Sequence, residues 1–224
     1  MIDPKPFILS FKLAFVVTGI LLVVSVPLAY WLAYTKSRVR IFVGTMVTMP
    51  LVLPPSVLGF YLLVAFSPVS GFGKFLQDHF DIRLAFSFGG LVIASVIYSL
   101  PFMVNPIQAG LQSLPAELRQ ASYSLGKSRW TTLFRILLPN IRSSLVTGIV
   151  LSFAHTIGEF GVVLMIGGNI PGQTRLASIA IYDDVEMMNY GVAGKEALLL
   201  FLLSFCIVLT VYLINHKFKG AFHQ

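Results

Sequence analysis

The chain has 224 residues, of which 56% are hydrophobic and only 11% are charged, and its mean hydropathy is +0.84. Soluble domains carry about 25% charged residues, so this composition excludes an ordinary soluble domain and indicates a membrane protein. The net charge of +7 does not indicate nucleic-acid binding, because the aromatic residues lie within apolar runs rather than among basic ones. We therefore expect membrane lipid, and no nucleic acid, among its partners.

Five apolar stretches are long enough to cross the hydrocarbon core, which takes about 20 predominantly apolar residues. They lie at about 10–35, 41–66, 84–111, 141–166 and 196–215. The first is too long for the apolar region of a signal peptide, and no small-residue cleavage site follows it, so we interpret it as a retained helix. The sequence predicts an all-α polytopic membrane protein, with residues 1–224 forming one transmembrane domain.

The second span contains MPLVLPPSVLGFYLL, which places Pro50, Pro54 and Pro55 in mid-membrane. Each proline removes a backbone donor, and the freed carbonyls must find partners within the protein or line a cavity. Two interpretations stay open: a kink that serves packing, and a kinked helix that lines a pathway. Gly59 could allow close approach of a neighbouring helix.

A basic segment at 113–139, SLPAELRQASYSLGKSRWTTLFRILLP, separates the third and fourth spans. Pro115 suits the first turn of a helix, and Gly126 stands where a left-handed cap would end it. One face of this helix is predicted to hold Leu118, Ala121, Ser122 and Leu125. Ser128 can cap a second short helix, which Pro139 is expected to end. The second helix bears Trp130, Leu133, Phe134 and Leu137.

The fourth span contains FAHTIGEFGVVLMIGG, and Glu159 is the acid in its middle. An ionisable residue within the membrane indicates function, and His155 lies four residues earlier on the same helical face, where the two could pair. A structural pair and a role in a substrate path both stay open. A metal site is not expected, because no second His or Cys completes one. Gly158 and Gly161 flank Glu159 and permit close helix contact.

Two outer segments differ in character. Residues 67–83 are expected to form a loop, and residues 167–195 begin with turn signals and then indicate a short helix from about Thr174 to Tyr182. The fifth span holds Cys206, the single cysteine, so disulfides and cysteine-based metal sites are excluded.

The distribution of Lys and Arg predicts the orientation, because these residues are kept on the cytoplasmic side. With the N-terminus outside, the inner segments hold ten of them and the outer segments six. The inner set is Lys36, Arg38, Arg40, Arg119, Lys127, Arg129, Arg135, Arg142, Lys217 and Lys219. The N-terminus is therefore predicted outside, the C-terminus in the cytoplasm, and segment 113–139 at the cytoplasmic face.

From pattern alone, segment 113–139 is either an amphipathic hairpin on anionic lipid or a docking element for a cytoplasmic protein. It resembles the loop of binding-protein-dependent ABC importer permeases, whose pattern is E-A-A, three residues, G, nine residues, then I-x-L-P. Gln120, Ala121 and Ser122 occupy the E-A-A places, Gly126 follows at the family's spacing, and Ile136, Leu138 and Pro139 complete the pattern. Gln and Ser are departures from that pattern.

The resemblance narrows at PLVLPP in the second span and at GEFG and GNIPGQTR near the fourth, which look like the molybdate permeases of the sulfate, molybdate and tungstate importer group. Family members commonly carry Arg where this chain has His155. If that Arg pairs with the Glu, the corresponding pair in this chain would depend on pH. The resemblance favours molybdate as the transported oxyanion, does not separate molybdate from tungstate, and leaves sulfate as an alternative.

This resemblance implies the type I ABC importer fold, in which the chain forms a homodimer with two cytoplasmic ATPase subunits and an external oxyanion-binding protein. ATP and Mg would belong to the ATPase, because the chain has no G-x-x-x-x-G-K-[ST] sequence, and no cofactor is expected in the chain itself. The expected docking residues are Glu117, Gln120, Ala121, Ser122, Leu125, Gly126, Trp130, Ile136, Leu138 and Pro139. The residues expected in the path or in helix packing are Pro50, Pro54, Pro55, Gly59, His155, Gly158, Glu159, Gly161 and Asn169.

Two other classes of protein remain as alternatives. A polytopic membrane enzyme acting on lipid or prenyl phosphates would use acids such as Asp183, Asp184 and Glu186, although no His accompanies them. A channel or proton-coupled carrier would need Glu159 but would leave the Gly126 segment unexplained.

Overall fold

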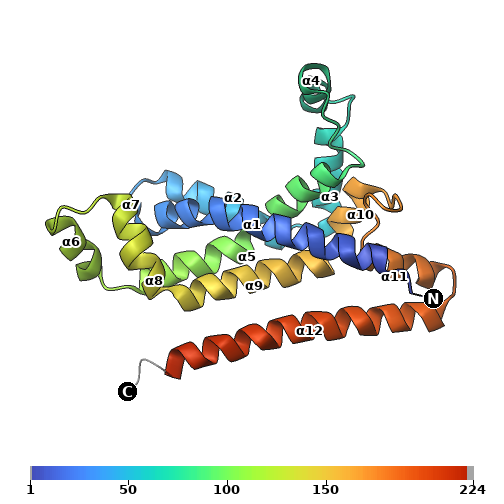
Figure 1. The fold of residues 1–224 in the computed structure, drawn as a ribbon. Coiled ribbons are helices and arrows are strands. Elements are labelled where there is room, and N and C mark those ends of the chain that lie inside the picture. The colour runs from blue at the N-terminus through green and yellow to red at the C-terminus, as the bar shows by residue number, and fades with distance from the viewer. Residues whose placement is uncertain (1, 221–224) are drawn as a thin grey trace.

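The computed structural model describes residues 2–220, and it describes side chains up to residue 213. Every regular element in this range is helical, which confirms the all-α prediction (Figure 1). The elements are α1 Pro4–Tyr34, α2 Val39–Val52, α3 Pro55–Phe66, α4 Gly71–Phe80, α5 Phe88–Ser113, α6 Ala116–Ser124, α7 Arg129–Thr132, the π-helical η1 Leu133–Leu137, α8 Leu138–Asn140, α9 Arg142–Gly158, α10 Gly161–Gly167, α11 Ala177–Glu186 and α12 Tyr190–Gly220.

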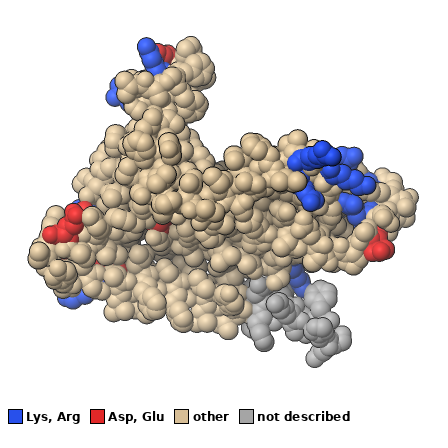
Figure 2. Space-filling model, turned by 180° about the vertical axis from the view of Figure 1, so that it is seen from behind, with Lys and Arg blue, Asp and Glu red and all other residues tan. Residues whose placement is uncertain are grey.

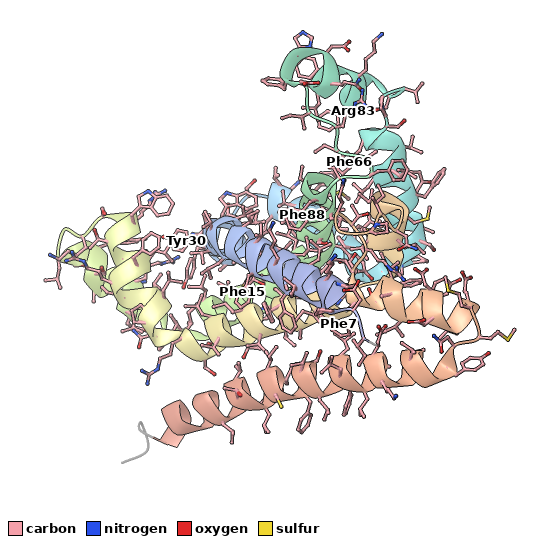
Figure 3. All side chains as sticks on the ribbon, turned by 45° about the vertical axis from the view of Figure 1, so that its right-hand side comes forward. Phe7, Phe15, Tyr30, Phe66, Arg83 and Phe88 are labelled. Atoms are coloured by element: carbon pink, nitrogen blue, oxygen red, sulfur yellow. The ribbon has the colours of Figure 1, made fainter. Side chains whose placement is uncertain are left out.

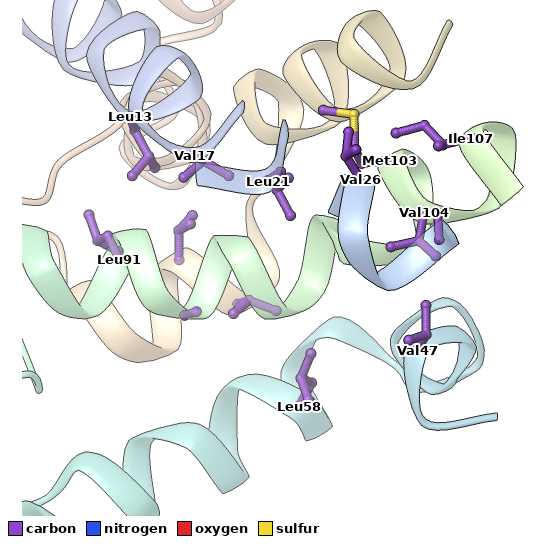
Figure 4. Packing of buried hydrophobic residues seen from close by; sticks show 14 of the residues in the cluster. Leu13, Val17, Leu21, Val26, Val47, Leu58, Leu91, Met103, Val104 and Ile107 are labelled. Atoms are coloured by element: carbon purple, nitrogen blue, oxygen red, sulfur yellow. The ribbon is translucent and has the colours of Figure 1, made fainter. Parts of the chain in front are cut away.

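The core lies where α1 crosses α5, with α9 and α10 alongside. Leu13, Val17 and Leu21 project from α1 toward α5, where Leu91 and Met103 are fully buried (Figure 4). These three α1 residues are four positions apart, so they lie on one face of the helix, and this face packs against the rest of the protein. The opposite face keeps exposed apolar side chains, as a helix that also meets lipid requires.

Among the residues that the structure describes, three helices are long and apolar enough to cross a membrane, and they coincide with the first, third and fifth predicted spans: α1, α5 and α12 over Tyr190–Leu213. The chain has up to five spans if each of two sharply bent helix pairs also counts as one. Because α12 begins at Tyr190 rather than near residue 196, Glu196 lies inside the helix and is only 4% exposed.

The second predicted span, 41–66, is two helices, and its break is sharper than a kink. The axes of α2 and α3 differ by 113°. Leu53 and Pro54 are both extended, with ψ of 135° and 136°, because each precedes a proline whose ring disfavours helical geometry. Pro55 begins α3, where its missing N–H is harmless, while Pro50 stays within α2.

The fourth predicted span, 141–166, is also interrupted, and the prediction of one continuous helix there is wrong. Helix α9 ends at Gly158, Glu159 is extended with ψ of 135°, and α10 starts at Gly161. The hydroxyl of Ser178 on α11 donates to the Glu159 carbonyl at 2.6 Å, so the main-chain acceptor at the break is satisfied by the protein.

Both predicted outer segments need correction. Residues 67–83 contain helix α4, capped by Ser70, whose hydroxyl accepts from the Gly73 N–H at 2.9 Å. Helix α11 begins at Ala177 rather than near Thr174. Thr174 instead holds the preceding turn, since its hydroxyl donates to the Gly167 carbonyl at 2.6 Å and accepts from the Ile170 N–H at 2.9 Å.

Lys and Arg gather at the end of the molecule that carries α6 and α7, whereas the broad middle of the same face is almost uncharged (Figure 2). Acidic and basic residues both occur at the opposite end and on α4 (Figure 2). Lys217 and Lys219 belong to the predicted inner set but lie beyond the side chains that the structure describes.

Candidate functional site

Segment 113–139 folds as two short helical stretches joined at Gly126, as its sequence predicts. Gly126 has φ of +72°. Its N–H donates to the Tyr123 carbonyl at 2.9 Å, and the Lys127 N–H donates to the Ser122 carbonyl at 3.1 Å. These two bonds are the Schellman arrangement, which closes a helix with a left-handed residue that glycine adopts without strain.

The second stretch is longer than predicted. Ser128 caps it, accepting from the Thr131 N–H at 3.2 Å, and the helical backbone continues through η1 and α8 to Asn140. Pro139 therefore does not end it, and the helical turn directly before this proline is the π-helical η1. The chain turns instead at Ile141, and α9 leaves at 82° to the stretch Arg129–Asn140.

A buried hydrogen bond fixes the two stretches against each other. The hydroxyls of Ser122 and Thr132 lie 2.8 Å apart, and both side chains are buried. Thr132 also donates to the Ser128 carbonyl at 2.9 Å, so Ser122 is the donor in the pair. The serine that departs from the family pattern thus helps to fix the shape of this element, and Thr132 is a residue that sequence reasoning missed.

Several large apolar side chains of this element are exposed beside its polar and basic residues. Leu125 is 76% exposed and Trp130 61%, and the Trp130 ring stacks on Phe134 with centroids 6.0 Å apart. The single face predicted for the first helix is wrong, because Ser122 turns inward while Leu125, at the cap, turns outward. The surface is completed by exposed Glu117, Gln120, Ala121 and Gly126, while Ile136 and Leu138 are half-buried and Pro139 is exposed.

A second candidate site is a pocket of about 680 Å³ at the meeting point of the two helix breaks. Its walls come from the start of α3, from α5, and from the break between α9 and α10. The lining residues are Pro55, Ser56, Tyr98, Ala154, His155, Gly158, Glu159, Phe160 and Gly161. Five of these were predicted as path or packing residues, and Ser56 and Tyr98 are the polar lining residues that sequence reasoning missed.

Glu159 and His155 share this pocket but do not pair, so the predicted contact is wrong. The helix ends before Glu159, and the i, i+4 geometry that would join the two is lost. The His155 ring instead stacks on Phe102, with centroids 4.1 Å apart, and lies 4.9 Å from the Tyr98 ring. Glu159 is 4% exposed, and its carboxyl forms no ion pair among the described residues, while the hydroxyl of Ser95 on α5 lies near it.

Glycines bring the two interrupted helices together, as predicted for two of three positions. A Cβ at Gly161 would lie 2.6 Å from the Pro55 Cβ, and one at Gly59 would lie 2.8 Å from the Met165 Cβ. Helices α3 and α10 therefore pack closely because both contact points lack a side chain. Gly158 makes no such contact, since a Cβ there would meet nothing within 4 Å.

Four predicted path residues lie outside the pocket lining: Pro50, Pro54, Gly59 and Asn169. Asn169 lies in the turn that follows α10 and attaches this turn to α11, because its amide nitrogen donates to both Asp183 carboxylate oxygens at 3.0 and 2.8 Å. Arg175 completes this cluster with an ion pair to Asp183 at 3.0 Å. No group of three His, Cys, Asp or Glu side chains in the described part of the chain could hold a metal ion.

Comparison with known proteins identifies a family, several relatives in that family and solved structures of the same fold. Residues 25–220 match the family described as binding-protein-dependent transport system inner membrane component. The chain is 45% identical to the molybdenum transport system permease protein ModB of Azotobacter vinelandii, covering 95% of this chain and 94% of that protein. It is 32% identical to the putative molybdenum permease YvgM of Bacillus subtilis, covering 91% and 89%.

A probable sulfate transport system permease protein of Zygnema circumcarinatum is 34% identical, covering 96% of this chain and 76% of that protein. Among solved structures, a bacterial alginate ABC transporter matches with a TM-score of 0.78 at 17% identity, covering 96% of this chain and 78% of the other. The methionine ABC transporter MetNI matches with a TM-score of 0.75 at 16% identity, covering 97% and 99%. At these identities the two structures establish the fold.

Proposed function

This chain belongs to the family of inner membrane components of binding-protein-dependent transport systems, and on that premise we propose that the oxyanion it carries is molybdate. The observation that carries the proposal is the 45% identity to the Azotobacter permease along nearly all of both chains. Tungstate shares molybdate's charge and tetrahedral shape. Sulfate is the other candidate, because a probable sulfate permease is 34% identical.

The chain is a transport subunit, and its energy comes from ATP bound and hydrolysed by a separate cytoplasmic subunit. We place the contact with that ATPase on the element built from α6, α7 and η1. Exposed Leu125 and the Trp130–Phe134 stack support this placement, because apolar side chains at a water-facing end gain most from burial against a partner. The Gly126 cap fixes the angle between the two halves that present them.

We further propose that the N-terminus lies outside, the C-terminus lies in the cytoplasm and two copies of the chain form the transmembrane unit. The gathering of Lys and Arg at the α6 and α7 end supports the orientation (Figure 2). A single-cysteine scan on a Cys206→Ser background tests it, with an impermeant thiol reagent applied to intact cells. Labelling at position 172 and protection at position 127 are expected, and the reverse pattern would overturn the orientation.

The pocket at the helix breaks is proposed as part of the translocation path. Interrupted helices are tolerated at membrane depth only where they are buried in protein or line a cavity, and the interruption before Pro55 meets the one at Glu159 here. The buried carboxyl of Glu159 supports the same proposal, because an ionisable side chain within the membrane that has no ion-pair partner among the described residues indicates a functional site.

The acids that a lipid-phosphate enzyme would use are already engaged in structural contacts. Asp183 binds Asn169 and Arg175, Asp184 accepts from Asn189 at 3.2 Å, and Glu186 accepts from the Tyr182 hydroxyl at 2.6 Å. This arrangement favours a transport subunit over that enzyme class.

The decisive experiment is uptake by the complex of this chain, its ATPase and its binding protein, reconstituted into vesicles. Labelled molybdate is offered with unlabelled molybdate, tungstate or sulfate as competitors. We expect ATP-dependent molybdate uptake that tungstate inhibits far more strongly than sulfate. Preferred uptake of sulfate would reassign the substrate, and absence of ATP-dependent uptake of all three would overturn the proposal.

A further inference from the structure

Side chains of helix α6 contact side chains of helix α1, although the two helices are far apart in the sequence. The hydroxyl oxygens of Tyr30 and Tyr123 lie 2.9 Å apart. One turn away, the Arg119 guanidinium carbon lies 4.1 Å from the centre of the Tyr34 ring. On α1 the contacting residues are Tyr30 and Tyr34, and on α6 they are Arg119 and Tyr123, so each pair is four residues apart. The earlier residue of α1 contacts the later residue of α6, and the two helices therefore run antiparallel over this one turn.

Tyr34 also ties this contact to a third helix. Its hydroxyl donates to the Leu111 carbonyl at 2.8 Å, in the last turn of α5, where carbonyls have no partner within the helix. The Tyr30 and Tyr34 rings meet edge to face at 5.2 Å, so the two tyrosines form one block at the end of α1. Figure 3 shows Tyr30 at the end of α1 that faces the α6 and α7 region.

The position of α6 depends on such contacts because the helix has only nine residues, too few to be stable alone. One route from it to the membrane helices follows the backbone through α7 and η1 into α9. The tyrosine block is a separate route, leading to α1. Helix α1 packs along α5 and α9, and these two helices supply Tyr98 and His155 to the pocket.

We propose that Tyr30, Tyr34, Arg119 and Tyr123 are positioning residues that carry the displacement of α6 to α1, and through α1 to the helices that line the pocket. This inference rests on the proposed function, in which the partner ATPase moves the α6 element. The alternative is that these contacts only hold α6 in place and transmit no displacement, which we call a static brace. The two hypotheses predict different effects on transport when one hydroxyl is removed.

The test uses the reconstituted complex with Tyr30→Phe, Tyr123→Phe and the double variant. Each change keeps the ring and removes only a hydroxyl. ATP hydrolysis and molybdate uptake are measured in the same vesicles, and ATPase retention is measured by copurification. Losing one hydrogen bond in the coupling path is expected to lower uptake per ATP about fivefold, with the ATPase still bound. The double variant should fall no further than the single ones, because both remove the same bond.

The matched control is Tyr182→Phe, which also loses one hydroxyl bond, to Glu186, but at a distance from α6. Its uptake per ATP is expected to equal that of the unaltered complex. An unchanged ratio in Tyr30→Phe and Tyr123→Phe would overturn the inference. So would reduced ATPase retention with an unchanged ratio, since that is the result a static brace predicts.

A Gly126→Leu arm separates this inference from the proposed function. If Gly126→Leu loses the ATPase while the tyrosine variants couple normally, the docking proposal stands and the tyrosine route alone is wrong. If Gly126→Leu keeps the ATPase and transports normally, the docking proposal itself fails and the tyrosine route fails with it.

Discussion

Gly161 faces Pro55 so closely that a Cβ added to the glycine would lie 2.6 Å from the Cβ of the proline. This contact joins the first residue of α10 to the first residue of α3, so the two helix breaks are held together by the absence of one side chain. The pocket that opens beside it depends on this approach.

Gly161→Ala is therefore expected to destabilise the protein by about 1–3 kcal/mol, the usual cost of forcing a methyl group into a packed contact. The measurement is thermal unfolding in detergent, followed by loss of the monodisperse peak after heating. Gly158→Ala is the matched control, since its added Cβ meets nothing within 4 Å. Equal melting temperatures for the two variants would contradict the packing described here.

Gly126→Leu should leave the protein in the membrane but release the ATPase. A side chain at φ of +72° costs about 1–2 kcal/mol, enough to change the angle at the α6 cap. We expect about a tenfold loss of copurified ATPase, measured on protein extracted from equal amounts of membrane. Gly172→Leu controls for backbone strain alone, because Gly172 has φ of +74° and equally open surroundings but lies in the turn before α11.

Full ATPase retention and transport by Gly126→Leu would remove the docking role from this element. Loss of ATPase from Gly172→Leu to the same extent would show instead that the effect comes from strain anywhere in the chain.

Glu159→Gln is expected to lower molybdate uptake about tenfold without unfolding the protein, because the shape of the side chain is kept while a carboxyl oxygen is replaced by an amide donor, and one hydrogen bond is worth about 0.5–1.5 kcal/mol. The buried carboxyl of Glu159 lines the pocket. Glu196→Gln is the control, since Glu196 is also only 4% exposed but does not line the pocket. Wild-type uptake by Glu159→Gln would make Glu159 incidental to transport.

Asp183→Ala should loosen the turn between α10 and α11. The carboxylate accepts two bonds from Asn169 and pairs with Arg175, so its loss frees both side chains. Trypsin cleavage after Arg175 in intact spheroplasts is expected to accelerate about tenfold, since the lost bonds are charge-assisted. Asp184→Ala, which loses a single exposed bond to Asn189, should cleave at the original rate. Equal rates for both variants would show that Asp183 does not hold the turn.

The amino-acid sequence alone was enough to predict the membrane class, the all-α fold and the places of three long helices. These follow from composition and from runs of apolar residues, which need no knowledge of neighbours. It also predicted a kink at Pro54 and Pro55, where the structure has a full break between two helices, and the left-handed turn at Gly126, because steric restriction by proline and the freedom of glycine are local properties of the chain.

The tertiary structure decided the rest. No proline marks the break at Glu159, and the sequence therefore suggested a helical His155–Glu159 pair that the fold does not form. Tyr30 and Tyr123 are separated by 93 positions, and no sequence pattern indicates that they are in contact, yet their hydroxyl oxygens lie 2.9 Å apart. Contacts of this kind depend on how whole helices pack, and packing is a property of surfaces brought together from distant parts of the chain rather than of any local run of residues.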